Sequence, residues 1–327
     1  MTKILITGSS GYIGKSLLLY LKDKFIIKGI DKNPEEFTTK KINLLNKKKL
    51  NKFIKLFKPD IVIHLAAQSL VDETINKKKY YLNNIVATKN LLSCLSENNI
   101  KNIIFSSTAA VYKYTSKPLR EKDDLKLIST YAKTKYECEK LISRSRLNYI
   151  ILRFFNVCSS LKIGNKITGE LHKPETHLIP TLVYKSIFKK KIYIYGDSYK
   201  TKDGSCIRDY IHIKDICSAI KKSVIKIKKT NSIKEIVNIG SQSQISNLEI
   251  LNYIKKITKQ NINFEIANKR KGDVAILSCS ISKAKRILKW TPVNSKIQKI
   301  INDEVLWVNY LKNKNINRTF KNYVWKF

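Results

Sequence analysis

Short runs of apolar residues recur along the first half of the chain, and amphipathic segments separate them. The runs lie at 3–7, 25–30, 61–64, 102–106 and 149–152, and a later run lies at 235–239. Segments with helical spacing lie at 12–22, 50–57, 82–95 and 131–143. Apolar strands that alternate with amphipathic helices are typical of a parallel sheet with helices on both faces. The pattern therefore predicts an α/β fold of the Rossmann type, with a doubly wound parallel sheet.

The pattern becomes irregular after residue 155. The second half contains a polar loop-like stretch at 158–176, a helical pattern at 177–189, a strand-like alternation at 192–195 and a second loop at 201–208. We therefore predict a first domain over 1–155, which a segment near 209–245 rejoins. A smaller α/β C-terminal domain is expected over 156–327.

Composition narrows the class of protein. Of the 327 residues, 43% are hydrophobic, as in an ordinary globular protein, and no run approaches the roughly 20 apolar residues of a membrane span. The N-terminus lacks the ordered basic, apolar and small-residue segments of a signal peptide. The six cysteines are scattered and form no CxxC pair, which argues against a disulfide framework or a cysteine zinc site. We expect reduced thiols in a cytoplasmic protein that is not bound to a membrane.

The net charge of +39 raises the possibility of a nucleic-acid partner. The lysines are spread along the whole chain, without interleaved aromatic residues or a basic tail. A general compositional bias explains this distribution better than a binding site does. We therefore expect no specific nucleic-acid partner, and only weak, nonspecific binding at low salt.

Three glycines follow the first apolar run in the spacing GxxGxxG, at Gly8, Gly11 and Gly14. Glycines between a strand and a helix allow a tight turn and bring backbone N–H groups to a pyrophosphate. Asp31 ends the second run, where a carboxylate can bond the adenosine ribose and repel a 2′-phosphate. The sequence therefore predicts NAD as the cofactor in preference to NADP.

A tyrosine and a lysine four residues apart form the second candidate site. The spacing occurs four times, at Tyr20/Lys24, Tyr131/Lys135, Tyr136/Lys140 and Tyr210/Lys214. Tyr131 alone is expected in the first turn of a helix, with Lys135 on the same face. A nearby ammonium lowers the pKa of a phenol, which makes Tyr131 a candidate base. The Ser-Ser-Thr stretch at 106–108 ends the fourth strand, and its hydroxyls would complete a proton-handling site.

Further motifs carry a resemblance to a known family. They are TGSSGYIG (7–14), HLAA (64–67), SSTAAVY (106–112), LRFFN (152–156), HLIP (177–180), DGSCIRDYIHI (203–213), KRKGD (269–273) and SKAKRILKWTP (282–292). The chain resembles the extended short-chain dehydrogenases/reductases, and within them the UDP-glucose 4-epimerase family, almost from end to end.

The resemblance implies a role for each matching residue. Tyr131 would be the base and acid, Lys135 its electrostatic partner, and Thr108 the hydroxyl that contacts the sugar 4-OH. The implied cofactor-binding residues are Gly8, Gly11, Tyr12, Ile13, Gly14, Asp31, Asn43, Leu44, Leu65, Ala66, Ala67, Asn83, Ser106, Tyr131, Lys135 and Phe154. The implied substrate-binding residues are Thr108, Tyr131, Asn156, His177, Leu178, Tyr193, Tyr195, Arg208, Arg270 and Asp273. Arg208 and Arg270 would bind the diphosphate, with an ion pair from Arg208 to Asp203 or Asp209 as the structural alternative. His64 and His212 are expected to be structural, and no metal is expected.

The implied activity is the NAD-dependent interconversion of UDP-glucose and UDP-galactose by transient oxidation at sugar C4. The first domain would bind NAD, the second the UDP sugar, and the protein would be a homodimer. Three departures from the family pattern, at Gln68, Asn43 and Phe154, lie among cofactor positions and leave the catalytic groups intact.

Alternative functions remain at this stage. A 4-epimerase of another UDP sugar, such as an N-acetylhexosamine, a glucuronate or a pentose, fits the same motifs. Leu277, at the position that helps to decide whether an N-acetyl group fits, is intermediate in size. A dehydratase is disfavoured because Ala109 and Ala110 follow Thr108 in place of the usual acid pair. A protein that binds NAD or nucleic acid without catalysis is disfavoured because the catalytic residues are intact.

Overall fold

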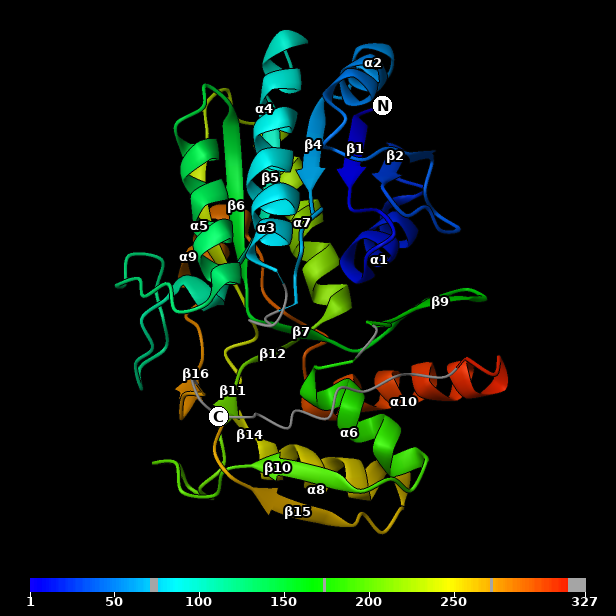
Figure 1. Ribbon diagram of the computed structural model, residues 1–327, viewed down its shortest axis with the longest axis vertical. Helices are drawn as coiled ribbons and strands as arrows, with labels where there is room; N and C mark the ends of the chain where they lie inside the picture. The colour runs from blue at the N-terminus through cyan, green and yellow to red at the C-terminus, as the bar shows by residue number, and fades with distance from the viewer. Residues whose placement is uncertain (71–75, 173–174, 271–272, 317–327) are drawn as a thin grey trace.

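The computed structural model describes residues 1–70, 76–172, 175–270 and 273–316. Its main feature is a seven-stranded sheet with the strand order β13-β6-β5-β4-β1-β2-β3 (Figure 1). The strands are β1 (Lys3–Thr7), β2 (Ile26–Asp31), β3 (Lys40–Lys41), β4 (Ile61–His64), β5 (Asn102–Thr108), β6 (Asn148–Phe154) and β13 (Lys234–Ile239). Every neighbouring pair is parallel. The predicted Rossmann-type sheet is therefore confirmed.

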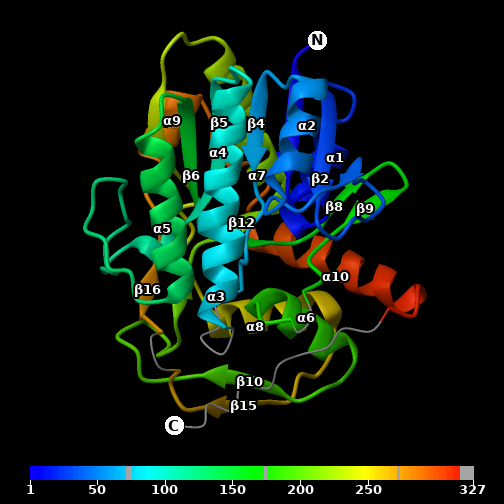
Figure 2. The same cartoon turned by 45° about the horizontal axis from the view of Figure 1, so that its top comes forward.

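Helices cover both faces of this sheet, which explains why its central strands are apolar throughout. One face packs against α1 (Tyr12–Leu21), α7 (Ile213–Lys228) and α9 (Ser282–Leu288). The other face packs against α2 (Lys47–Phe57), α4 (Ala87–Glu97) and α5 (Thr130–Ser143), which lie in front in Figure 2. In α2, Leu50, Ile54 and Phe57 recur at helical spacing and are the buried residues of that helix.

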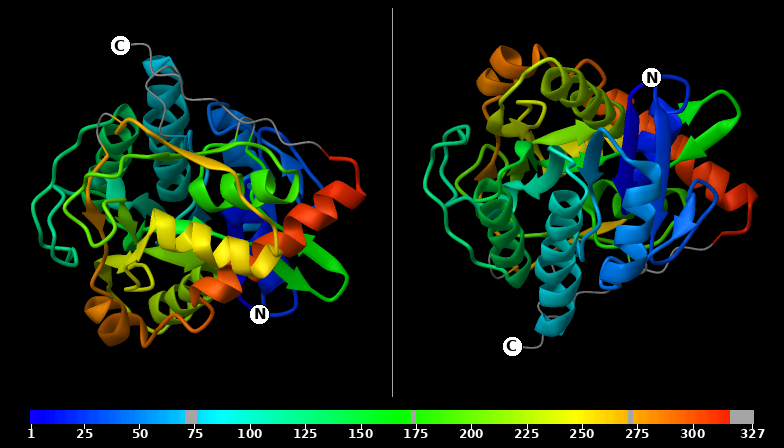
Figure 3. Two further views of the ribbon diagram at one scale, coloured as in Figure 1. Left: turned by 90° about the horizontal axis from the view of Figure 1, so that it is seen from below. Right: turned by 90° about the horizontal axis from the view of Figure 1, so that it is seen from above.

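A smaller layer lies beyond the carboxyl ends of the strands (Figures 1 and 3). Its helices α6 (Leu178–Ile187), α8 (Asn247–Thr258) and α10 (Ile297–Asn313) share a core with the parallel pair β10 (Ile192–Tyr195) and β15 (Phe264–Ala267). A three-stranded sheet joins β14 (Ile245–Ser246), β11 (Ile207–Arg208) and β16 (Ile276–Leu277). The pair β7 (Asn156–Cys158) and β12 (Tyr210–His212) connects this layer to the large sheet.

Two segments differ from the sequence-based expectation. The stretch expected to be loop at 158–176 contains a hairpin of β8 (Leu161–Ile163) and β9 (Lys166–Thr168), which turns at Gly164 with φ of +56°. Strands of three residues are too short to show alternation. The single helix expected over 82–95 starts earlier and is interrupted. It consists of α3 (Lys77–Tyr80), a π-helical turn η1 (Tyr81–Val86) and α4. The π turn places Asn84 against Gln68 and Thr134, contacts that lie outside the helix itself.

Two further expectations concern the cysteines and the membrane. All six cysteines are buried as free thiols. Among the described residues, no helix combines the length and apolar character needed to cross a membrane.

Candidate functional site

The glycine loop joins β1 to α1 at the centre of the sheet. Gly8 has φ of +76°, and a Cβ there would lie 2.6 Å from the backbone nitrogen of Ala66, at the end of β4. A Cβ on Gly14 would lie 2.1 Å from the carbonyl oxygen of Gly8. Only glycine fits either position. Helix α1 starts directly after Gly11 and has no acidic residue in its first turn, so its N-terminus suits a phosphate.

Asp31 ends β2 beside this loop. Its carboxylate accepts hydrogen bonds from the backbone nitrogens of Ser10 (3.2 Å) and Asn33 (2.9 Å). The side chain therefore connects the glycine loop to the turn after β2. An acid in this place disfavours a second phosphate on the ribose, which supports the predicted choice of NAD.

The other predicted cofactor residues line the same end of the sheet or the core behind it. Asn43 is exposed and its Oδ1 accepts from the backbone nitrogen of Leu45, whereas Leu44 is buried in the core. Asn83 accepts a hydrogen bond from Lys32 at 3.2 Å. Ser106 bonds the carbonyl oxygen of His64, and Phe154 is buried in the core. The remaining residues are Tyr12 and Ile13 at the start of α1 and Leu65, Ala66 and Ala67 after β4.

Tyr131 and Thr108 meet where β5 and α5 approach each other. Thr108 is the last residue of β5, and Tyr131 is the second residue of α5, which Ser129 caps by accepting from the nitrogen of Ala132 at 3.1 Å. Burial raises the pKa of Tyr131 to about 12, and a side-chain hydrogen bond with Thr108 acts in the opposite direction. The predicted contact between the two hydroxyls is present.

Lys135 lies one turn later on α5 and is 2% exposed. Its Nζ atom lies 4.1 Å from the centre of the Phe105 ring. Burial lowers the pKa of this ammonium to about 8, while Cys138 and Glu139 act to raise it. The expected lowering of the Tyr131 pKa by Lys135 was wrong for the protein alone. Lys135 is buried and Tyr131 is partly buried, and for each group burial outweighs the other effects on its pKa.

A buried network that the motifs did not predict supports α5. Glu139 accepts two hydrogen bonds from the Arg153 guanidinium, at 3.0 and 2.7 Å, and one from the hydroxyl of Ser107 at 2.5 Å. All three side chains are at most 3% exposed. Glu139 is one turn beyond Lys135 on the same helix face, and this spacing was a signal available in the sequence. The network fixes α5 to the strand that carries Thr108.

The arginine pair lies in the smaller layer. Arg208 on β11 and Arg270 share the carboxylate of Asp273, at 3.4 and 2.8 Å. Arg270 also lies over the ring of Tyr195, 5.0 Å from its centre. Two guanidinium groups with one carboxylate leave a net positive charge, which suits a diphosphate. Asp273, which is also predicted to contact substrate, forms ion pairs with both arginines and orients them.

The alternative partners of Arg208 are engaged elsewhere. Asp209 is fully buried and accepts from the backbone of Ser241, Gln242 and Cys279. Asp203 accepts from Ser205 and Ser246. The alternative that Arg208 pairs with Asp203 or Asp209 was therefore wrong. Tyr193, at the start of β10, contacts Lys185 and Lys191, so the structure favours Tyr195 at the arginine pair.

The remaining predicted substrate residues mark the boundary between the two layers. Asn156 starts β7 and donates to the carbonyl oxygen of Asp209 at 3.0 Å. His177 is the N-cap residue of α6, and Leu178 is the first residue of that helix. The Nδ1 atom of His177 lies 2.8 Å from Glu175.

His64, predicted to be structural, has both ring nitrogens bonded to threonine hydroxyls, Thr7 at 2.7 Å and Thr88 at 3.0 Å. Burial and then Lys135 lower the pKa of His64 to about 3. The ring is therefore a neutral structural group that links β1 and β4 to α4.

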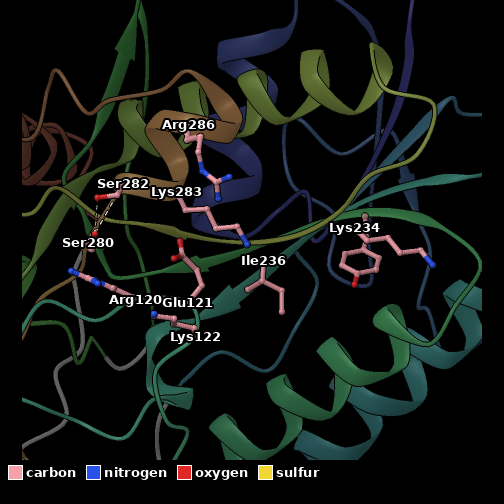
Figure 4. Close-up of a pocket in the computed structure, with 10 residues that line it drawn as sticks. Arg120, Glu121, Lys122, Lys234, Ile236, Ser280, Ser282, Lys283 and Arg286 are labelled. Carbon is pink, nitrogen blue, oxygen red and sulfur yellow. Dashed lines mark hydrogen bonds between the residues drawn. The ribbon is translucent and has the colours of Figure 1, made fainter.

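A separate groove runs along the edge strand β13 and contains none of the predicted site residues (Figure 4). Its lining includes five basic side chains, Arg120, Lys122, Lys234, Lys283 and Arg286, and the acid Glu121. Lys283 bonds Glu235 at 2.8 Å. The groove is a basic part of the surface, and Tyr131 is not among its lining residues.

The glycine loop, the carboxylate that ends β2 and the Tyr131–Lys135 pair at the same end of the sheet indicate a class of protein: a Rossmann-fold enzyme that binds a dinucleotide. Comparison with known proteins agrees with this class. The model of the NAD dependent epimerase/dehydratase family matches residues 4–240. The chain therefore belongs to the NAD-dependent epimerase/dehydratase family, and the resemblance is confirmed.

Individual relatives are similar over nearly the whole chain. The UDP-glucose 4-epimerase of Halalkalibacterium halodurans is 33% identical over 319 aligned positions, which cover 93% of this chain and 95% of that protein. The UDP-glucose 4-epimerase of Mycoplasma genitalium is 34% identical over 330 positions and covers 93% and 95%. The crystal structure of UDP-glucose 4-epimerase from Brucella ovis in complex with NAD has a TM-score of 0.88, at 29% identity, and covers 94% of this chain and 98% of that one.

Proposed function

We propose that this enzyme interconverts UDP-glucose and UDP-galactose, with NAD as its cofactor, by transient oxidation at sugar C4. The observation that carries the proposal is the hydrogen-bonded pair of Tyr131 and Thr108, with buried Lys135 one helical turn away. The pair lies at the carboxyl end of β5, and only β4 separates β5 from β1, the strand that leads into the glycine loop. This is where ligands bind in open α/β sheets.

The residues of the loop fit NAD. Gly8 and Gly14 leave no room for side chains, the N-terminus of α1 carries no acid, and Asp31 stands at the ribose position. NAD, when bound, accepts a hydride from C4 of the sugar and returns it.

The side chains of this chain handle the proton. We assign Tyr131 as the base that takes the proton of the sugar 4-OH and later returns it, and Thr108 as the hydroxyl that orients that oxygen. The phenol of Tyr131 is held protonated by burial, with a pKa of about 12. The positive charge of Lys135, and of the oxidised cofactor beside it, favours the phenolate.

Binding of the substrate mainly through its UDP group allows the sugar ring to rotate within the site. Arg208 and Arg270 would bind the diphosphate, and His177 and Leu178 would line the uridine pocket. Strong contacts to the nucleotide and weak contacts to the sugar let the 4-keto sugar rotate and receive hydride on its opposite face. In this assignment residues 1–155, with the segment near 209–245, bind NAD, and residues 156–327 bind the UDP sugar.

The choice of sugar depends on the residue beside Arg208. Leu277 on β16 is the register partner of Arg208 on β11, so its side chain belongs to the strand next to the diphosphate anchor. Leucine is intermediate in size between residues that admit and residues that exclude an N-acetyl group. UDP-N-acetylglucosamine is therefore included in the test below as a second substrate.

We further propose a cytoplasmic homodimer. Helices α4 and α5 lie side by side on one face. Tyr81, which leads into α4, is 49% exposed, and Ile128, which precedes α5, is 52% exposed. A face of this kind suits a second copy of the chain. Light scattering during size exclusion should give twice the mass of the chain, and a monomer would contradict this assignment.

The activity is tested by incubating purified protein with UDP-galactose, without added NAD, and following the sugar by proton NMR. The proposal predicts a mixture of UDP-glucose and UDP-galactose, because NAD stays bound between turnovers. Parallel samples contain UDP-N-acetylglucosamine and UDP-glucuronate. Conversion of one of these alone, with UDP-galactose unchanged even after NAD is added, would reassign the substrate. Conversion of none would contradict the proposed function.

A further inference from the structure

A cluster of two histidines and two glutamates lies between the β8–β9 hairpin and the start of α6. Glu170, His172 and His177 each offer one ligand atom, and these atoms all lie within 4.8 Å of one another. The Nδ1 atom of His172 lies 2.9 Å from Oε1 of Glu170, and that of His177 lies 2.8 Å from Oε1 of Glu175. The two imidazole rings are stacked with centres 5.5 Å apart.

Both carboxylates of this cluster are buried. Glu170 is 6% exposed and Glu175 is 1% exposed. A carboxylate that is buried and charged needs a cation or several hydrogen-bond donors close by.

Glu175 is only half satisfied by its neighbours. Its Oε1 atom accepts from the backbone nitrogens of Thr176 and His177 as well as from the imidazole. Its Oε2 atom is buried and has no hydrogen-bond partner within the part of the chain that the structure describes. The Nδ1 atom of His172 is likewise buried without a hydrogen bond of good geometry, although Glu170 lies close to it. A buried carboxylate oxygen without a donor, next to a histidine of this cluster, indicates a missing ligand rather than a finished network.

We propose that Glu170, His172 and His177 bind one divalent transition metal ion, with Zn²⁺ as the best fit, and that Glu175 orients His177 through its contact with Nδ1. Two imidazole nitrogens with carboxylate oxygens form a donor set that suits zinc, cobalt and nickel better than magnesium or calcium. Zinc bonds of about 2.0–2.1 Å place tetrahedral ligand atoms about 3.4 Å apart. The most widely separated ligand atoms must therefore approach by up to about 1.4 Å. The side chain of His172 is 32% exposed and can make this movement.

The metal would connect three elements of the smaller layer. Glu170 follows β9, and its carbonyl oxygen accepts from the Trp307 indole of α10 at 2.8 Å. His177 is the N-cap of α6. One ion at this point would fix the N-terminus of α6 to the hairpin and to α10. The argument from unpaired cysteines excluded only thiolate sites, so it does not bear on this cluster.

The test uses full-length protein without an affinity tag, treated with EDTA and dialysed, and titrated with Co²⁺ as an optical probe of the metal alone. The proposal predicts one Co²⁺ per chain, with the visible absorption of a tetrahedral or five-coordinate ion, displaced by one equivalent of Zn²⁺. The same Zn²⁺ should raise the melting temperature.

The variant His172→Gln should weaken binding by at least about tenfold and abolish the Zn²⁺-dependent rise in melting temperature. Glu36→Gln is the matched control, because Glu36 pairs at the surface with Lys166 of the same hairpin and lies outside the cluster. It should bind metal like the wild type. If His172→Gln does not fold, Glu170→Gln replaces it, since glutamine keeps the shape and removes the charge.

Three results would overturn the proposal. The first is that the wild type binds neither Co²⁺ nor Zn²⁺ stoichiometrically. The second is that the wild type and the cluster variants bind the metal equally well, and the third is that Glu36→Gln loses binding. Because the readouts are absorption and melting temperature, they do not depend on the proposed epimerase activity.

Discussion

Burial acts in opposite directions on the two ionisable groups of the candidate active site. It raises the pKa of Tyr131 to about 12 and lowers that of Lys135 to about 8, so each pKa shifts in the direction that favours the neutral form, while Lys135 still keeps its charge at neutral pH. The identity of these residues could be predicted from spacing and motif. Their burial could not be predicted, because it depends on residues that the folded chain brings close, such as Phe105 of β5, whose ring lies against Lys135. The same holds for Asp273, whose contact with Arg208 joins residues that are 65 positions apart.

Replacing Tyr131 with phenylalanine removes only the hydroxyl that moves the proton. We predict that kcat for UDP-galactose falls by roughly 10²–10⁴-fold, the usual contribution of a positioned acid–base group. The melting temperature should change little, because the ring still fills its place. Tyr136→Phe on the same helix is the matched control and should retain activity. An equal loss in both variants, or none in Tyr131→Phe, would remove Tyr131 from the catalytic role.

Replacing Lys135 with methionine should abolish activity and stabilise the cofactor-free protein at neutral pH. The folded pKa of about 8 lies below the ordinary 10.5, so the unfolded chain holds this proton more tightly. Stability from this group therefore rises as pH increases from 8 to 10.5, and its burial as a cation is unfavourable below pH 8. The variant should gain on the order of 1–3 kcal/mol in free energy of unfolding at pH 7.

This gain should shrink towards pH 10, as urea denaturation at the two pH values would show. Lys133→Met is the control, since Lys133 is exposed on the same helix and should show no such pH dependence. A Lys135→Met protein that is less stable than the wild type at pH 7 would contradict the assignment of burial as the main effect on Lys135.

At the scale of elements, α5 is positioned by its cap and by the Glu139–Arg153 pair. The sequence predicted the helices α1, α2, α4, α5 and α6 and the strands of the large sheet other than β3, because their apolar periodicity extends over several turns or strands of five or so residues. It did not single out α7, α8 or α10, which follow the irregular part of the pattern after residue 155. It did not predict the β8–β9 hairpin or the π turn η1. Three-residue strands have no measurable period, and η1 exists because Asn84 bonds Gln68 and Thr134 from other segments.

Replacing Glu139 with glutamine should destabilise the protein by about 3–5 kcal/mol, because it leaves the buried Arg153 guanidinium without its counter-charge. Glu137→Gln on the same helix is the control. Glu137 pairs with Lys140 at the surface, and losing this pair should change stability by less than about 1 kcal/mol. Chemical denaturation measures both, and equal effects would show that the buried network does not hold α5.

At the scale of the whole molecule, the charge of +39 is the feature that neither fold nor site explains. Part of this charge lies in the groove along β13 (Figure 4). The sequence did not predict the groove, because its lining comes from four separate segments of the chain. Tyr131, the proposed catalytic residue, is not among the residues that line this groove. The charge is therefore a property of the surface as a whole.

We predict salt-sensitive, sequence-independent binding to nucleic acid. Fluorescence anisotropy with labelled duplex DNA should show binding at about 50 mM salt that is largely lost by about 200 mM. Scrambled duplexes should bind equally well. The double variant Lys122→Glu/Lys234→Glu should weaken binding only slightly, because the groove holds a small part of the total charge. Strong preference for one sequence at physiological salt would contradict this expectation.

The central claim is that a hydride leaves sugar C4 and returns to the same carbon from the opposite side. The most direct test incubates the enzyme in ordinary water with UDP-glucose that carries deuterium at C4, and analyses the product by mass spectrometry and NMR. We expect UDP-galactose that keeps its deuterium at C4. UDP-galactose with hydrogen at C4 would mean that the label exchanged with solvent, and would contradict a transient oxidation by tightly held NAD.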